Sequence, residues 1–337
     1  MEEKLENTFQ ITAPGALTTI QDQGRIGYGS MGITTSGAVD QKAMETANIL
    51  VGNQRKEAVL ESTLMGPSIV FHTDCLIAMT GADMQATLAG EPVPLYKPVV
   101  AHAGECLVTG IAKTGCRGYI AFAGGMEILE VAGSKSLHLG CSMGGGFGRA
   151  LRADDVIRLS YSLEEMQSII RKVQLFIKRR QINKNQLLLN SVVQDRIKQR
   201  KIRVIMGPQD DYFTEHGIQT FLSQTYHVSN DSNRMACKLT GQYIDYKETT
   251  DIISDGIALG SIQVSSNGQP IIMLTDRQTT GGYAKIATVI SVDIPILAQC
   301  KPQDSVQFEA VTLREAQRCY RQQEKKMRRL EKKYGLS

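Results

Sequence analysis

The sequence has no apolar segment long enough to cross a membrane and no leader typical of an exported protein. A membrane-spanning helix needs about 20 mostly apolar residues in a row, and no run in the 337 residues approaches that length. The first residues, MEEKLENTF, are acidic and lack the apolar core of a signal peptide. The seven cysteines are scattered singly without a C-x-x-C pair, which favours reduced, structural thiols. These absences predict a cytoplasmic protein that does not bind a membrane.

The motifs of familiar stand-alone catalysts are also missing. The glycine-rich segment GCSMGGGFGRAL (140–151) has no Lys-Ser or Lys-Thr after it, so we interpret it as a turn or close-packing segment, not a phosphate loop. The letters GCSMG (140–144) fit G-x-S-x-G, but we interpret them as part of this turn and not as a nucleophile elbow. No Met-Lys-Met biotin attachment site occurs. The histidines lack zinc-ligand spacing, so no metal site is expected: they are His72, His102, His138, His216 and His227. Catalysis would therefore need a polar pocket.

Charge is unevenly distributed. The net charge is +4, but residues 171–203 hold eleven Lys or Arg and one acid, and residues 312–337 hold nine Lys or Arg and three Glu. The rest of the chain is therefore acidic. Basic stretches can bind nucleic acid, but these have little aromatic interleaving and no nucleic-acid motif. Solvated helix faces are the favoured interpretation, and no nucleic-acid partner is expected.

The pattern along the chain predicts a mainly β protein with two domains. Short strands and glycine-rich turns occupy 8–161, interrupted by a helix that begins after Asp40 and stops near Gly52. A basic helical connector is predicted at 162–202, where Ser162 and Glu165 have capping-box spacing. Strand signals return at 203–311. A basic helix at 312–337 ends the chain and either docks on its own body or contacts a partner.

One stretch, LTDRQTTGGYAKIATVI (274–290), is unusually rich in hydrogen-bonding groups. If it is a hairpin, strand alternation puts Asp276 and Gln278 on one face, Arg277 on the other, and Tyr283 with Lys285 on one face. The Gly281-Gly282 pair would supply backbone freedom and close approach. This mixture of groups suits a small substrate with carbonyl, amide and carboxylate groups. The alternative is a well-bonded hairpin with a solvated tip.

Other segments offer further candidate residues. SNDSNRM (229–235) contains Arg234, a natural clamp for a carboxylate, next to Asn233. In TSGAVD (35–40), Ser36 is a candidate, and Asp40 is either a site residue or a helix N-cap. Glu61 lies in a strand-like run, where it faces either a barrel lumen or water.

Ten segments, in order, resemble the allophanate-hydrolase-subunit-2 family, also called the biotin-dependent carboxyltransferase family. The resemblance spans about residues 10–310. It implies two cyclophilin-like β-barrel domains and a subunit-B-like partner. The segments are GALTTIQDQGRIGYGSMGITTSGAVD, ANILVGN, LESTLMGP, MTGADM, GRALRADDV, GPQDDYF, SNDSNRMACKL, SDGIALGSIQV, GQPIIML and DRQTTGGYAKIATVI.

The sequence departs from the family pattern in three places. Ala284 stands where the family commonly has Pro, which leaves the exit from the glycine pair less constrained. Lys135 stands where Arg is usual, so a planar donor fork is lost. The connector at 162–202 looks longer and more basic than is typical.

The resemblance implies a role as the C subunit of an ATP-dependent 5-oxoprolinase, which opens 5-oxoproline to glutamate with the A and B subunits and is inactive alone. ATP would bind with or through the partner subunits. One alternative is carboxyl transfer from carboxybiotin to a small amide such as urea, the only case that needs biotin. Another is a non-catalytic protein that sequesters a subunit-B-like kinase inhibitor.

Under the first hypothesis each candidate has a role. Asp276 and Lys285 form the acid/base and charge-stabilising pair, and Arg234 holds the substrate carboxylate. The remaining substrate-binding candidates are Asn233, Gln278, Thr279, Thr280, Tyr283, Ser36, Asp40 and Glu61.

Overall fold

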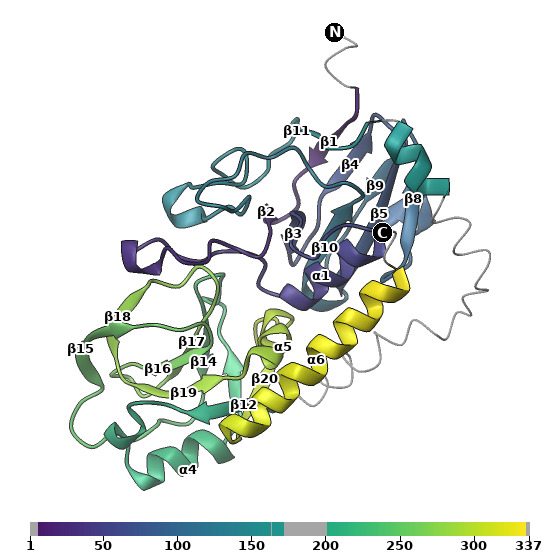
Figure 1. Cartoon of the computed structure of the whole chain (residues 1–337). Coiled ribbons are helices and arrows are strands. Elements are labelled where there is room, and N and C mark those ends of the chain that lie inside the picture. The colour runs from purple at the N-terminus through teal and green to yellow at the C-terminus, as the bar shows by residue number, and fades with distance from the viewer. Residues whose placement is uncertain (1–5, 163, 172–200, 335–337) are drawn as a thin grey trace. The chain divides into compact units, whose positions relative to one another are not determined.

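The computed structural model describes residues 6–162, 164–171 and 201–334 (Figure 1). These residues form two compact units. Of the described residues, unit 1 contains 6–24, 40–162, 164–171 and 327–334, and unit 2 contains 25–39 and 201–326. The segment 25–39 thus groups with the second unit, although in sequence it lies inside the first predicted domain. In the described part of the chain, no helix combines the length and apolar character needed to span a bilayer.

Unit 1 contains two antiparallel sheets. The six-stranded sheet has the order β11-β1-β4-β9-β6-β7, and the five-stranded sheet has the order β2-β3-β10-β5-β8. Its elements are β1 (Thr8–Ala13), β2 (Thr18–Gln21), α1 (Gln41–Leu50), β3 (Val59–Thr63), β4 (Ser68–Phe71), β5 (Cys75–Asp83), β6 (Thr87–Leu88), β7 (Glu91–Pro92), β8 (Pro98–Ala101), β9 (Cys106–Val108), β10 (Thr114–Phe122), η3 (Leu139–Cys141) and β11 (Val156–Arg158).

The two sheets of unit 1 meet across an apolar core. Phe9 of β1 stacks on Phe122 of β10 with ring centroids 4.3 Å apart, so side chains of both sheets interdigitate. Helix α1 packs on β5 and β10 with Met44 and Ala47 buried. The mainly β prediction is confirmed. The described strands of this unit, however, form two sheets, so the expectation of a closed barrel is not met here.

Unit 2 contains a closed barrel of seven strands in the order β12-β19-β16-β17-β14-β13-β20. Strand β12 closes it by pairing parallel with β20 and antiparallel with β19. Strands β15 and β18 form a separate two-stranded ribbon. The elements are η2 (Gly29–Met31), β12 (Lys201–Met206), η4 (Asp210–Tyr212), α4 (Glu215–Ser223), β13 (Tyr226–Val228), β14 (Ala236–Thr240), β15 (Asp251–Gly256), β16 (Ser261–Val264), β17 (Pro270–Met273), β18 (Thr280–Tyr283), β19 (Lys285–Val289), η5 (Ser291–Asp293), α5 (Ile294–Ala298) and β20 (Ser305–Ala310).

The helix predictions hold except at the end of the predicted connector, where Lys201 and Ile202 belong to strand β12. Asp40 caps α1, because its Oδ1 accepts from the Ala43 N–H at 2.9 Å. Residues 164–171 are helical. Their capping box is present: the Ser162 N–H and hydroxyl both donate to Glu165 Oε2 at 2.9 Å. The rest of the predicted connector, 172–200, lies outside the described residues.

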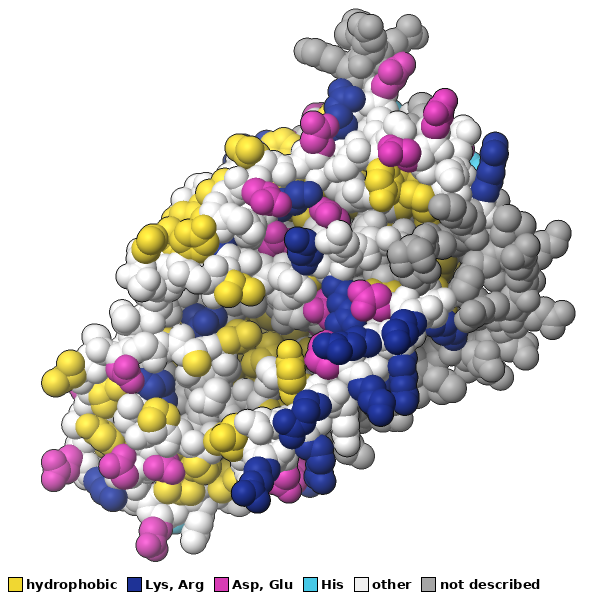
Figure 2. Space-filling view, in the orientation of Figure 1, with side chains coloured by type: hydrophobic (Ala, Val, Ile, Leu, Met, Phe, Trp, Pro, Cys, Tyr) yellow, Lys and Arg dark blue, Asp and Glu magenta, His cyan; other side chains and the backbone are white. Residues whose placement is uncertain are grey.

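The predicted C-terminal helix is α6 (Leu313–Tyr334). Lys and Arg side chains gather along it in Figure 2. Of the apolar and aromatic residues along it, only Met327 and Tyr334 are buried, whereas Leu313 and Tyr320 are exposed. A second capping box, in which Glu315 Oε2 accepts from the Thr312 N–H and hydroxyl, starts the helix and is not among the predicted caps.

The glycine-rich segment 140–151 is a close-packing turn, as predicted. A Cβ on Gly145 would lie 2.6 Å from Leu137 Cβ, a distance that real atoms do not adopt. Lys135, which stands where the family usually has Arg, is fully engaged: its Nζ lies 2.6 Å from Glu57 Oε1 and 3.1 Å from the Met126 carbonyl oxygen. The Lys135 ammonium therefore makes both contacts without the planar guanidinium of an arginine.

Candidate functional site

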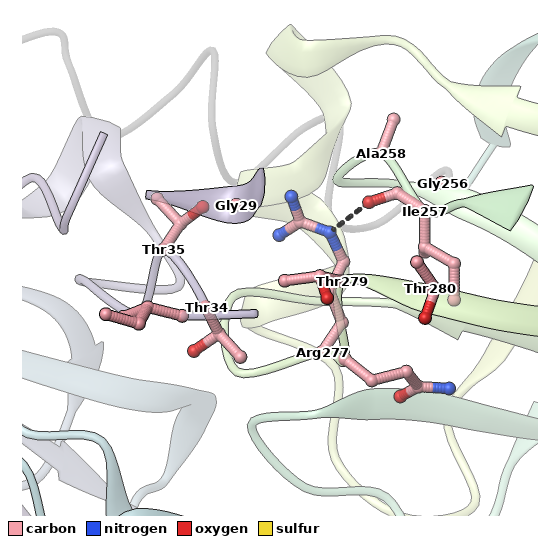
Figure 3. Close-up of a pocket in the computed structure, with 11 residues that line it drawn as sticks. Gly29, Thr34, Thr35, Gly256, Ile257, Ala258, Arg277, Thr279 and Thr280 are labelled. Atoms are coloured by element: carbon pink, nitrogen blue, oxygen red, sulfur yellow. Dashed lines mark hydrogen bonds between the residues drawn. The ribbon is translucent and has the colours of Figure 1, made fainter. Parts of the chain in front are cut away.

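Unit 2 contains a pocket of about 490 Å³ beside the β15–β18 ribbon (Figure 3). This volume is in the range of small-molecule sites, about 300–1,000 Å³. The loop around η2 forms one wall, and the segments at the ends of β15 and β18 form the other. The lining residues are Gly29, Ile33, Thr34, Thr35, Gly256, Ile257, Ala258, Arg277, Gln278, Thr279 and Thr280.

Among the described residues that line the pocket, Arg277 alone is ionisable. Its Nε donates to the Ile257 carbonyl oxygen at 3.0 Å, the bond drawn in Figure 3, and its Nη1 donates to the Leu274 carbonyl oxygen at 3.2 Å. Among the described residues, no carboxylate pairs with this guanidinium, and its Nη2 has no protein partner. Burial lowers the pKa of Arg277. A half-buried cation without a counter-ion is a favourable place for an anionic ligand group.

The other polar groups of the pocket are short hydroxyls and one amide. Within the described chain, the side chains of Thr35, Thr279, Thr280 and Gln278 hydrogen-bond to no protein group, although all four line the cavity. Their donors and acceptors are therefore free for water or a ligand. Gln278 and Thr280 are exposed and Thr35 and Thr279 are half-buried, so a ligand in the pocket can reach all four. The pocket can bind carbonyl and N–H groups next to an anion.

Backbone pairing fixes these side chains in place. The Ile257 N–H donates to the Thr279 carbonyl oxygen at 2.9 Å, and Gly256 pairs with Thr280 in the ribbon. Gly281 favours this approach, because a Cβ there would lie 2.6 Å from Ile257 Cδ1 and would force the Ile257 side chain to shift. A Cβ on Gly282 would meet nothing closer than 3.4 Å. The predicted close approach therefore belongs to Gly281, and neither glycine has a positive φ.

The hairpin predicted for 274–290 is wrong. Strand β18 pairs with β15, and β19 pairs with β16 and β12, so the chain runs from the ribbon directly into the barrel. Residues 275 and 276 form a turn, which removes the predicted strand face shared by Asp276 and Gln278. Ala284 interrupts the alternation between β18 and β19, so Tyr283 is exposed and Lys285 is buried. Ala284 also donates its N–H to the Thr250 carbonyl oxygen at 2.7 Å, a bond that Pro could not make.

Arg234 and Asp276 form a buried, bidentate ion pair. Arg234 Nε lies 2.9 Å from Asp276 Oδ2, and Nη2 lies 3.1 Å from Oδ1. The same Nη2 donates to the Gly37 carbonyl oxygen at 2.7 Å. The pair therefore ties the segment 25–39 to the turn that carries Arg277. Neither residue lines the pocket, and the groups predicted to bind substrate and move protons bind each other.

Lys285, the predicted partner of Asp276, makes a different ion pair. Its Nζ lies 2.8 Å from Oδ2 of the exposed Asp255 in β15. The hydrogen bond from Lys285 lowers the pKa of Asp255. The Lys285 N–H also donates to Gln209 Oε1 at 3.2 Å. The two residues proposed as one acid/base pair thus belong to two separate ion pairs.

The remaining predicted residues of unit 2 have local structural contacts. Asn233 Oδ1 accepts from the N–H groups of Met235 and Ala236, at 2.8 and 3.3 Å, and so closes a turn. Ser36 is buried at φ 52° and donates its N–H to the Thr275 carbonyl oxygen at 3.0 Å. Tyr283 contributes its carbonyl oxygen to Gln263 Nε2 at 3.2 Å. None of the three lines the pocket.

Asp40 and Glu61 belong to unit 1, where Tyr119 links them. The Tyr119 hydroxyl donates to Glu61 Oε2 at 2.8 Å and accepts from the Asp40 N–H at 2.8 Å. Burial, followed by the negative charge of Glu61, raises the pKa of Tyr119 well above its ordinary value. Glu61 therefore lies in neither a lumen nor water, and Asp40 is the helix N-cap.

Of the residues predicted to bind substrate, the structure brings Gln278, Thr279 and Thr280 together in the pocket. The prediction missed Arg277 as the cation, although Arg277 lies in the same motif. It also missed Thr34 and Thr35, which belong to the segment GITTSG (32–37). In the described part of the chain, no group of three or more His, Cys, Asp or Glu side chains is placed to hold a metal ion.

Similarity to known proteins extends over most of the chain. The family described as "Carboxyltransferase domain, subdomain A and B" matches residues 31–310. The chain belongs to this family. It is 34% identical to the C subunit of 5-oxoprolinase from Escherichia coli (strain K12) over 322 residues, covering 94% of this chain and 96% of that protein.

Some other relatives are longer proteins. The chain is 34% identical to urea amidolyase of Saccharomyces cerevisiae over 89% of its own length but only 16% of the yeast protein. The crystal structure of the K. lactis urea amidolyase superposes with a TM-score of 0.84 at 27% identity, covering 96% of this chain and 20% of that one. The fold is thus that of one region within a larger urea amidolyase.

Proposed function

We propose that the chain is the C subunit of an ATP-dependent 5-oxoprolinase and acts together with the A and B subunits. The observation that carries the proposal is the end-to-end match to the C subunit of the Escherichia coli 5-oxoprolinase, 94% of one chain against 96% of the other. Matches of similar identity to urea amidolyase cover only a small part of that protein. The proposal therefore follows the relative that this chain matches over nearly its whole length.

The pocket of unit 2 supports a substrate such as 5-oxoproline. Arg277 would bind the carboxylate through Nη2, with Nη1 and Nε held by backbone carbonyl oxygens. The hydroxyls of Thr35, Thr279 and Thr280 and the amide of Gln278 would meet the lactam C=O and N–H. We assign the buried Arg234–Asp276 pair to positioning, because it fixes both walls of the pocket without lining it.

The residues that line the pocket are not suited to bind a nucleoside triphosphate. The pocket is lined by one arginine and no lysine, and no phosphate-loop motif occurs in the sequence. An unstrained amide is a poor electrophile, so phosphorylation of its oxygen would make a better leaving group. We therefore assign ATP binding to the partner subunits and derive no phosphoryl step from this chain. The residues of this chain would bind and orient the lactam.

The test is an activity assay of the chain with its co-encoded A and B subunits, ATP and 5-oxoproline, with glutamate release as the readout. We expect ATP-dependent turnover by the assembled proteins and none by the single chain. We expect Arg277→Gln to raise KM about 10–100-fold, since hydrogen bonds to charged groups contribute about 1.5–3 kcal/mol. Turnover by the single chain at the rate of the complex would refute the proposal.

The second candidate is carboxyl transfer from carboxybiotin to a small amide such as urea. The family match and the TM-score of 0.84 to the K. lactis urea amidolyase favour it. A biotinylated carrier, labelled bicarbonate and urea would replace 5-oxoproline in the same assay. Label transfer without glutamate release would select this candidate. A tight complex with the subunit-B-like protein and no turnover in either assay would indicate a sequestering role.

A further inference from the structure

A short closed loop in unit 1 holds a histidine against an exposed cysteine. His138 and Met143 pair at its base: the His138 N–H donates to the Met143 carbonyl oxygen at 2.8 Å, and the Met143 N–H donates back at 3.2 Å. Between them lies the 3-10 turn η3 (Leu139–Cys141), followed by Ser142 at φ 52°. The loop thus fixes the separation between His138 and Cys141.

The thiol and the imidazole are within hydrogen-bond distance. Cys141 Sγ lies 3.0 Å from His138 Nδ1, and the Cys141 N–H donates to the same Nδ1 at 3.1 Å. Gly140 leaves room for this ring, because a Cβ there would already be 3.1 Å from His138 Cε1. Cys141 itself is exposed. A nucleophile that reaches solvent therefore has a base beside it.

The environment of His138 fixes which ring nitrogen acts as the base. A backbone N–H can only donate, so Nδ1 is the acceptor and the ring proton is on Nε2. Nε2 is buried and, in the described structure, has no hydrogen-bond partner. Nδ1 is therefore the ring nitrogen that faces the thiol.

We propose that Cys141 is a nucleophilic thiol, activated by His138, that is selectively oxidised by small peroxides. Nucleophile and base in hydrogen-bond contact are the arrangement that activates a cysteine. Thiolate character and exposure together decide which cysteine oxidises. The site is independent of the pocket in unit 2 and of the function proposed for it.

The other cysteines differ from Cys141 in exposure or in partner. Four are buried, and burial raises the pKa of one of them, Cys75. Cys106 is half-buried and has no imidazole beside it. Cys319 accepts from Arg203 Nη1 at 3.1 Å, but the Arg203 guanidinium is bound by Asp293 through two nitrogens. Among the described residues, Cys141 alone combines exposure with a neighbouring base.

The reaction is balanced with hydrogen peroxide as the oxidant. Sγ attacks one peroxide oxygen as His138 Nδ1 takes the thiol proton and gives up the hydrogen bond from the Cys141 N–H. The S–O bond forms, the O–O bond breaks, and the leaving hydroxide takes the proton from Nδ1 to become water. The sulfur loses two electrons to the peroxide and becomes sulfenic acid.

The full-length protein should be pulsed with hydrogen peroxide at neutral pH in the presence of dimedone, which traps sulfenic acid. Mass spectrometry then gives a rate for each cysteine. We expect Cys141 to react at least about tenfold faster in the wild-type protein than in His138→Asn. This is a modest part of the 10²–10⁴-fold rate enhancement typical of a positioned base. Asn can still accept from the Cys141 N–H, so it keeps the turn and removes the base. Cys106 is the internal control.

The result that supports the proposal is a fast Cys141 that slows in His138→Asn while the Cys106 rate and the melting temperature stay constant. If His138→Asn disturbs the fold, His138→Gln provides the same comparison. Equal Cys141 rates with and without the imidazole would mean that exposure alone governs its reactivity, which overturns the proposal. A wild-type Cys141 no faster than Cys106 overturns it as well.

Discussion

The two units of the molecule treat polar groups in opposite ways. In unit 1 the buried polar centre is closed: Tyr119 bonds to Glu61 and to the Asp40 N–H, and all three side chains are shielded from solvent. In unit 2 the pocket is open. Its arginine has no carboxylate partner in the described structure, and the hydroxyls of Thr279 and Thr280 bond to no protein group.

The difference separates structural polar residues from ligand-binding ones. Polar type alone does not distinguish them, because Asp40, Glu61 and Arg234 are as polar as Arg277. What distinguishes them is whether the protein itself satisfies the group. Buried groups with partners stabilise the fold, whereas groups in a recess without partners are available to a ligand. Four sets of variants test this distinction.

The largest expected effect is on the buried pair of unit 2. Asp276→Asn removes the charge that faces Arg234, and breaking a buried ion pair costs about 3–5 kcal/mol. Urea denaturation should show this loss in the free energy of unfolding. The control is Asp231→Asn, because Asp231 is an exposed carboxylate in the same segment as Arg234. Its free energy of unfolding should change by no more than about 0.5 kcal/mol. If Asp276→Asn were as stable as the wild type but inactive, the structural role would be wrong and Asp276 would be a catalytic residue.

The second comparison removes one hydroxyl from each region. Tyr119→Phe leaves Glu61 and the Asp40 N–H each without one bond in a buried place, which should cost about 1–3 kcal/mol. Thr279→Val removes a hydroxyl with no described protein partner and should change the free energy of unfolding by less than about 0.5 kcal/mol. Thermal unfolding of both variants measures the contrast. Equal losses of stability in Tyr119→Phe and Thr279→Val would contradict the distinction between polar groups that the protein satisfies and those that it leaves to a ligand.

A third pair of variants tests the wall of the pocket. Gly281→Ala puts a Cβ 2.6 Å from Ile257 Cδ1, so we expect a loss of about 1 kcal/mol, at the low end for overpacking because the Ile257 side chain can shift. Gly282→Ala meets no atom within 3.4 Å and serves as the matched control. Substrate KM should rise in the first variant only. A larger loss for Gly282→Ala would mean that the close approach lies elsewhere.

The smallest effect concerns the exposed end of the Lys285–Asp255 pair. Lys285 lowers the pKa of Asp255, so the pair contributes stability above the unfolded pKa, about 3.9, and loses it as pH falls through the lower folded pKa. In Lys285→Met the pKa of Asp255 should rise towards its ordinary value. A carboxyl titration by NMR measures it. An unchanged pKa would show that Lys285 does not set the charge of this carboxylate.

Much of the fold could be predicted from local signals. The Asp40 cap, the Ser162–Glu165 capping box and the C-terminal helix follow from rules that act within a few residues. The two sheets of unit 1, in place of a closed barrel, depend on long-range strand pairing, which periodicity does not encode. The grouping of 25–39 with unit 2 depends on long-range contacts in the same way.

The site could be predicted only in part. Thr279 and Thr280 are predictable because a dense polar motif is visible in one stretch. Strict strand alternation puts Arg277 on the opposite face from the predicted site, whereas the chain turns at Asp276. Arg234 looks like a free clamp in the sequence because nothing local shows that its partner is 42 residues away.

The most direct test of the pocket is a thermodynamic cycle of four affinities, in which both the ligand carboxylate and the Arg277 guanidinium are removed, singly and together. The affinity of the assembled complex for 5-oxoproline and for its carboxamide, which keeps the lactam but lacks the carboxylate, should be measured by calorimetry with wild-type chain and with Arg277→Gln. We expect the wild type to prefer the carboxylate by about 10–100-fold, the contribution of a charge-assisted contact, and the variant to bind both alike. An equal preference in wild type and variant would contradict the assignment of Arg277 to the ligand anion.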